Sequence, residues 1–113
     1  MANTFKVKTK AAVGTSITTV YTVPSSTTAI VLGLIVGNVT GSTVTATVHI
    51  ESDTSDTETN ETVKLIDGVT IPAGSSLEVL SGGKYVLQAT DVLKIDCSVA
   101  SKIDATLSIL EIT

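Results

Sequence analysis

Residues 42–50 read Ser-Thr-Val-Thr-Ala-Thr-Val-His-Ile, and this stretch decides the fold. From Val44 to Ile50 the even positions are apolar, while threonine and His49 occupy the odd positions between them. Successive side chains of a β-strand point to opposite faces, so a period of two places each set on a face of its own. The stretch therefore predicts a strand with one face in a core and the other face in water.

The same alternation recurs later in the chain, in residues 92–99 and 102–109. The side chains predicted to face inward there are Leu93, Ile95, Cys97, Val99, Ile103, Ala105, Leu107 and Ile109. Nowhere do apolar residues recur at i, i+3, i+4 and i+7 over three turns, which is the pattern of an amphipathic helix. The composition agrees, because 20 Thr, 15 Val and 10 Ile are residues that fit pleated strands better than helices.

Turn residues divide the chain at short intervals, for example at Pro24-Ser25-Ser26, Asp67-Gly68 and Gly82-Gly83. Between such turns we predict strands near residues 4–10, 15–23, 28–38, 42–51, 61–71, 75–80, 84–89, 91–99 and 103–112. Eight or nine short strands at this spacing predict an all-β fold, namely an antiparallel β-sandwich that is jelly-roll-like. We expect one domain, residues 1–113, in which residues 1–14 form an N-terminal arm or an edge strand.

Charge is sparse, since charged residues make up 16% of the chain and the formal net charge is −4. Binding to the nucleic-acid backbone requires clustered Lys and Arg, so we expect no nucleic-acid partner. The longest apolar run, residues 29–36, is shorter than the roughly 20 residues of a transmembrane helix, so we expect no membrane partner. Lys6 and Lys8 interrupt the place where a signal peptide has a continuous apolar stretch, which predicts a protein made in a cytoplasm.

Residue types that carry chemistry are few: His49 is the single histidine, and it is predicted to lie on a threonine-rich surface. Cys97 is the single cysteine, which excludes an internal disulfide, and its inward phase predicts a small hydrophobic core residue. The one long polar stretch, residues 52–62, carries the carboxylates Asp53, Asp56, Glu58 and Glu61. Their spacing matches no EF-hand pattern, so a solvated loop is favoured over a metal site. We therefore expect no catalytic, cofactor-binding or metal-binding residues and no enzymatic activity.

Residues 29–36, Ala-Ile-Val-Leu-Gly-Leu-Ile-Val, are apolar on both faces of the predicted strand. A sandwich of this length covers one face of each sheet with its own core, so the other face requires a neighbouring subunit or a covering segment. Gly33 within the run predicts a bulge or the close approach of another backbone. The alternative is a twisted central strand together with a frayed C-terminus.

The apolar phase shifts by one residue within residues 109–112. Either a bulge lies near Leu110, or Leu110 and Ile112 face outward into an interface. Together with the sparse charge, this pattern predicts a homo-oligomer. The predicted interface residues are Val31, Gly33, Ile35, Leu110 and Ile112.

Three further segments are Val20-Tyr21-Thr22-Val23-Pro24, Ile71-Pro72-Ala73-Gly74 and Asp91-Val92-Leu93-Lys94. Their sequences and order resemble small structural proteins of tailed bacteriophages, of the kind common in marine and cyanobacterial phages, over about residues 17–112. The resemblance implies a β-sandwich component of the virion, typically a capsid decoration (cement) subunit that binds the head shell as a trimer. The implied partners are further copies of the chain and the major capsid protein or other virion proteins. The implied location is the virion, assembled in the host bacterial cytoplasm.

Two alternative functions stay open at this point. The first is a neck, tail or fibre accessory subunit of the virion, because the resemblance indicates a virion structural protein more strongly than any one position on the virion. The second comes from another class, a carbohydrate-binding β-sandwich module. It is disfavoured because sugar-binding surfaces usually rely on exposed aromatic side chains, and the chain has one Phe, two Tyr and no Trp.

Overall fold

The computed structural model describes residues 2–52, 60–80, 83–99 and 103–113. In these residues the regular secondary structure is entirely β, with nine strands and no helix. The strands are β1 (Asn3–Val13), β2 (Thr18–Thr22), β3 (Thr28–Asn38), β4 (Val44–Glu51), β5 (Val63–Ile71), β6 (Ser76–Glu78), β7 (Tyr85–Leu87), β8 (Val92–Cys97) and β9 (Ile103–Ile112). Each predicted strand has its counterpart, with ends that differ by a few residues.

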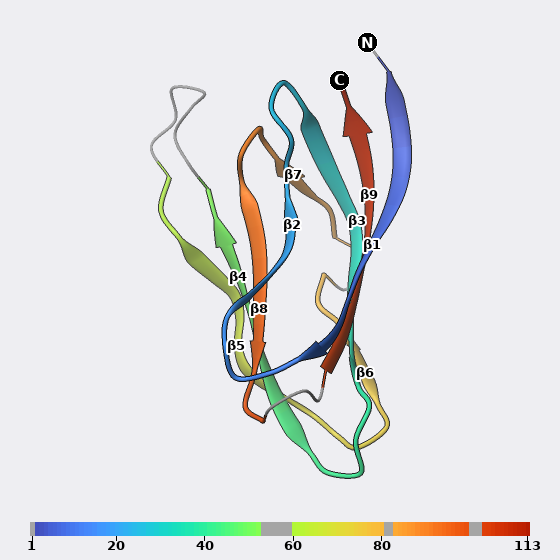
Figure 1. Ribbon diagram of the computed structural model, residues 1–113, viewed down its shortest axis with the longest axis vertical. Helices are drawn as coiled ribbons and strands as arrows, with labels where there is room; N and C mark the ends of the chain where they lie inside the picture. Colours follow the sequence, from blue (N-terminus) through green and yellow to red (C-terminus); the bar gives the residue numbers. More distant parts are fainter. Residues whose placement is uncertain (1, 53–59, 81–82, 100–102) are drawn as a thin grey trace.

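The strands form two antiparallel sheets that pack face to face, as Figure 1 shows. The first, which we call the β1 sheet, has the order β1-β9-β3, with β6 and β7 both paired to β3. The second, the β2 sheet, has the order β2-β8-β4-β5. Because β7 pairs with residues 29–31 of β3 and β6 pairs with residues 35–37, the two short strands share one position in the sheet.

The strand pairing is nested. The first strand lies beside the last, β2 lies beside β8, β3 lies beside β6 and β7, and β4 lies beside β5. Every one of these pairs is antiparallel, and the chain crosses repeatedly between the two sheets. Nested antiparallel pairing wound over two sheets is the jelly-roll topology. The predicted jelly-roll-like sandwich is therefore confirmed.

The core lies between the sheets and follows the predicted alternation. The inward side chains of β4, β8 and β9 are buried, and they are Val44, Ala46, Val48, Leu93, Ile95, Cys97, Ile103, Ala105, Leu107 and Ile109. The prediction for Val99 is wrong: its side chain is 42% exposed, because β8 ends at Cys97 and the chain bends at Ser98. Alternation predicts the face of a residue only as far as the strand continues.

The central strand β3 contains a bulge at Leu32. Val31 and Gly33 pair with successive residues of β9, Ile109 and Ser108, so Leu32 is an extra residue without a counterpart. The inward side chains before and after it are Ala29, Val31, Leu34 and Val36. The prediction that Gly33 marks a bulge is thus confirmed.

The last strand, β9, keeps its alternation throughout. Glu111, which is only 4% exposed, continues the inward phase, while Leu110 and Ile112 are half-buried on the outer face. The pairing of β9 with both neighbours is continuous over these residues, so the alternative of a bulge near Leu110 is wrong. The shift in apolar phase arises from a carboxylate at an inward position.

The first strand, β1, lies at an edge of its sheet and is oriented unusually. Lys6 and Lys8 stand opposite inward residues of β9, and directly opposite side chains lie on the same face. The lysines are therefore on the inner side, while Phe5 and Val7 face outward. Because the sandwich is open at this edge, the Lys6 side chain remains 43% exposed.

Candidate functional site

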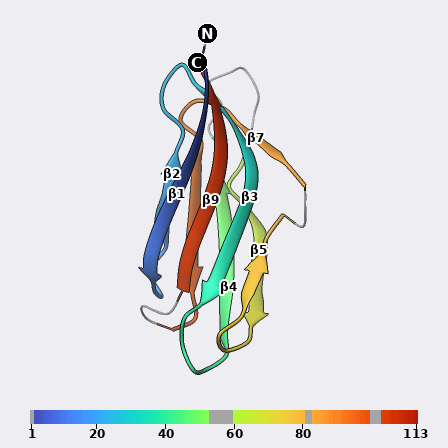
Figure 2. The same ribbon diagram turned by 90° about the vertical axis from the view of Figure 1, so that its right-hand side faces the viewer.

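Apolar side chains gather on the outer face of the β1 sheet, the face that Figure 2 turns toward the viewer. Four of these side chains form a row across the whole sheet, because each is paired directly with the next one on the neighbouring strand. The row is Phe5, Leu110, Ile30 and Val86, from β1 through β9 and β3 to β7. Directly opposite side chains on neighbouring strands contact one another, so the row is continuous. Phe5 is 74% exposed, and Val86 is exposed at the other end of the row.

The outward residues around this row extend the surface. We call the complete set the apolar face; it comprises Phe5, Val7, Ile30, Leu32, Ile35, Val86, Leu110 and Ile112. Single exposed apolar residues are ordinary on a protein, but a contiguous patch over several adjacent strands marks an interaction site. The apolar face is therefore the candidate functional site of the described residues.

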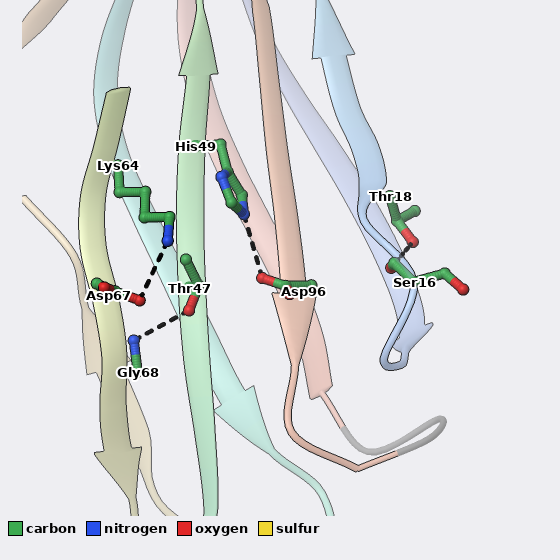
Figure 3. Close-up of polar contacts among 8 residues, drawn as sticks. All are labelled: Ser16, Thr18, Thr47, His49, Lys64, Asp67, Gly68 and Asp96. Atoms are coloured by element: carbon green, nitrogen blue, oxygen red, sulfur yellow. Dashed lines mark hydrogen bonds and ion pairs between the residues drawn. The ribbon is translucent and has the colours of Figure 1, made fainter. Parts of the chain in front are cut away.

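The outer face of the β2 sheet is polar instead, as Figure 3 shows. The His49 ring contacts Asp96 across the β4–β8 pair, with 3.2 Å between Nε2 and Oδ1. The backbone N–H of Gly68 donates a hydrogen bond of 2.9 Å to the Thr47 hydroxyl. The molecule thus presents one apolar and one polar broad side.

A hollow of about 310 Å³ lies within the apolar face. Its lining residues are Leu32, Gly33, Ile35, Glu78, Thr106 and Ser108. Gly33 has no side chain and lies opposite Ser108 on β9, so only small groups occupy this level of the two central strands. A Cβ atom added to Gly33 would meet nothing within 4 Å. The floor of the hollow is therefore open to any group that approaches the sheet from outside.

The structure brings together four of the five predicted interface residues. The outer face of the β1 sheet carries Gly33, Ile35, Leu110 and Ile112. Gly33 and Ile35 also line the hollow. Val31 does not lie on this face: it is 2% exposed and belongs to the core. A period of two places Val31 and Ile35 on one face, but the extra residue of the bulge separates them. Whether these outward residues contact another chain stays a prediction.

Sequence reasoning missed Phe5 and Val7, which contribute the most exposed part of the apolar face. Their alternation with Lys6 and Lys8 is visible in the sequence. An apolar set is ordinarily assigned to the core, whereas here the pairing with β9 turns that set outward. The lysines at every second position give no signal for this orientation, because lysine is almost never fully buried and would ordinarily be placed on the outer face.

A buried carboxylate joins the two sheets beside the apolar face. Glu111 of β9 accepts a hydrogen bond of 2.5 Å from the Tyr21 hydroxyl of β2, and its other oxygen lies 2.8 Å from Lys6 Nζ of β1. The hydrogen bond from Lys6 lowers the pKa of Glu111, the bond from Tyr21 acts in the same direction, and burial opposes both. Burial, followed by the contact with Glu111, raises the pKa of Tyr21. The cluster fastens β1 and β2 to the end of β9.

Groups with catalytic or metal-binding chemistry do not converge in the described residues. His49 lies on the outward face as predicted, but its ring is largely covered by its neighbours, and Asp96 is its hydrogen-bond partner. No three His, Cys, Asp or Glu side chains in this part of the chain could jointly hold a metal ion. Of the acidic residues singled out above, Asp53, Asp56 and Glu58 lie outside the described residues.

None of the described residues belongs to a helix with the length and apolarity needed to cross a bilayer.

Several solved structures share this fold. A chain of the Bacillus endospore appendages, which form a family of disulfide-linked pili, is 14% identical with a TM-score of 0.55; the match covers 99% of this chain and 87% of that one. A chain of the T13 IBDV viral particle and a chain of infectious bursal disease virus, Gx strain, are each 12% identical with a TM-score of 0.57. Both matches cover 96% of this chain, which spans 30% and 32% of those viral chains. No protein-family model and no curated protein sequence matches the chain.

Proposed function

We propose that the chain is a structural subunit of an assembled particle or appendage, and specifically a capsid decoration subunit of a tailed-phage virion. The observation that carries the proposal is the apolar face, which crosses every strand position of the β1 sheet. Burying such a face against a neighbour removes it from water and stabilises the assembly by the hydrophobic effect. The fold shared with pilus and viral chains supports the same role.

The two-sided character of the molecule suits this function. The apolar face would lie against a neighbour, and the polar outer face of the β2 sheet, with Thr47, His49 and Asp96, would remain in water. A disulfide-linked assembly has less support, because Cys97 is the single cysteine of the chain and is buried.

The finer features of the proposal come from the resemblance to phage structural proteins. It supports association as a trimer, attachment to the major capsid protein or other virion proteins, and a location in the virion. A neck, tail or fibre position is the alternative within the virion. We also propose that the chain is not an enzyme, since no nucleophile joins the His49–Asp96 pair in the described residues.

A carbohydrate-binding module is disfavoured on geometric grounds. Tyr21 is buried in the core, while Phe5 and Tyr85 lie at opposite edges of the β1 sheet. Tyr85 moreover pairs with the inward Val31, so its register places it on the other face from Phe5. The aromatic side chains therefore form no common platform on which a sugar ring could stack.

The proposal is tested by negative-stain microscopy of the parent particle carrying a tagged copy of the chain. A gold-labelled antibody against the tag shows where the copy lies. Label over the head shell is the expected result, and untagged particles are the control. Label confined to the neck, tail or fibres would replace capsid decoration by the accessory alternative. Tagged protein that is absent from purified particles would overturn the proposed function.

A further inference from the structure

The apolar face carries both a projection and a hollow. Phe5 projects from β1 and is the most exposed large hydrophobic side chain among the described residues. The hollow at Gly33 lies on β3, two strands away from β1. Phe5 pairs with Leu110 of β9 and Gly33 pairs with Ser108, so the two features are also two residues apart along β9. From the spacing of strands and residues, the two features are about 10 Å apart across the sheet and about 7 Å apart along it.

The bulge in β3 accounts for an irregularity beside Gly33, but it does not require that this residue lack a side chain. Its φ angle lies outside the left-handed region that favours glycine, and a Cβ added there would meet nothing. Glycine within a strand nevertheless weakens it, and a recurrent reason for accepting this cost is the close approach of another chain. The missing side chain is what opens the floor of the hollow.

We propose that two copies of the chain pair face to face, each inserting Phe5 into the hollow at Gly33 of the other. The inference rests on the proposal that the chain is a self-assembling subunit, and it names the contact. A projection and a hollow on one face match their counterparts in a second copy through a twofold axis that lies between the faces. Such an isologous contact is the commonest kind in oligomers of identical chains.

The size of the surface is sufficient for a stable pair. Three strands of 10 or 11 residues, with β6 and β7 of three residues each beside them, give a face of about 600 Å² per copy, or about 1,200 Å² in total. Specific protein interfaces bury about 1,200–2,000 Å² in total. The outward residues that would meet are mostly apolar or small; Glu78, which lines the hollow, is a charged residue that the contact would have to keep paired or hydrated.

The pairing is compatible with a threefold attachment through a different surface. A pair alone has a mass of two subunits of 11.6 kDa, a trimer alone has three, and both contacts together give six. Light scattering therefore distinguishes this contact from the trimer that the resemblance implies.

The experiment uses complementary variants at micromolar concentration. Phe5→Ala keeps the hollow and lacks the projection, whereas Gly33→Leu keeps the projection and fills the hollow. Each variant alone is expected to lose the twofold contact, and their equimolar mixture is expected to regain it, because one Phe5 then meets one open hollow. Ile17→Ala and Gly41→Leu are the matched controls: Ile17 is exposed outside the apolar face, and a Cβ at Gly41 also meets nothing.

Thermal unfolding of each variant shows that it is folded before its mass is interpreted. A mixture that remains at the mass of the separate variants would overturn the pairing, as would variants that keep the wild-type mass. A wild-type protein that has one or three subunits would also overturn it. In that event the proposed function would still stand if gold label is found on the head shell.

Discussion

At the scale of single residues, Glu111 shows how a polar group is accommodated in this sandwich. It occupies an inward position of β9 that an apolar residue would ordinarily fill, and Lys6 and Tyr21 each contact one of its oxygens. A buried carboxylate is stable only when it is paired and hydrogen-bonded, so the two partners are what make this position tolerable. Loss of either partner is expected to cost more than loss of an exposed ion pair.

The first prediction concerns the pH dependence of this cluster. The pKa of Glu111 is lower in the folded chain than in the unfolded chain, so its contribution to stability is present above the unfolded pKa and is lost as the pH falls through the folded pKa. Glu111→Gln is therefore expected to lower the free energy of unfolding by about 1–3 kcal/mol at neutral pH. The difference from wild type should shrink as the pH falls below about 4.

Urea unfolding at neutral and acidic pH measures this effect. Glu61→Gln is the control, because Glu61 is exposed and should change stability little at either pH. A loss for Glu111→Gln that is equally large in acid would mean that the charge of the carboxylate does not stabilise the fold.

At the scale of elements, the bulge in β3 determines which residues reach the outer face. Val31→Asp places an unpaired charge in the core and is expected to cost several kcal/mol of stability, or to prevent folding. Ile35→Asp, at a position that is 45% exposed and opposite Glu78 on β6, is expected to cost the single copy only about 1 kcal/mol. The prediction is checked by urea unfolding at a protein concentration low enough to exclude association. Equal losses for the two variants would contradict the bulge.

The sequence predicts where the strands of this fold lie better than it predicts which face of a strand is turned outward. In β4, β8 and β9 the alternation and the turn residues are local, and they identify both the strands and their inward faces. The orientation of β1 depends instead on pairing with β9, about a hundred residues away, so Phe5 was not assigned to the surface. The displacement of Val31 depends on one extra residue, Leu32, which a period of two cannot locate within a continuous apolar run.

The candidate site was likewise predictable in part. Gly33 and Ile35 were found because apolar residues on both faces of a strand leave a surplus, and Leu110 and Ile112 were found because they break the phase. The register that aligns them with Phe5 and Val86 in one surface exists only once the strands are paired. The pattern of apolar residues in the sequence thus indicates that an apolar face exists, whereas the pairing of the strands determines which residues belong to it.

At the scale of the whole molecule, the two outer faces predict how association responds to salt. Each copy carries a formal net charge of −4, so two copies repel one another at low ionic strength. Added salt weakens this repulsion, because the Debye length falls from about 30 Å at 0.01 M salt to about 10 Å at 0.1 M. Salt does not weaken the contact through the apolar face, because that contact does not depend on charge. The associated fraction of the wild-type protein is therefore expected to rise with added sodium chloride.

Light scattering across a salt series at constant protein concentration measures this fraction. Ile35→Asp serves as the control, because a carboxylate placed on the apolar face must lose its water when two copies meet. This variant is expected to remain at the mass of one subunit throughout the series. Dissociation of the wild-type protein by added salt would mean that charged groups, such as the lysines of β1, hold the copies together, and the apolar face would then lose its assigned role.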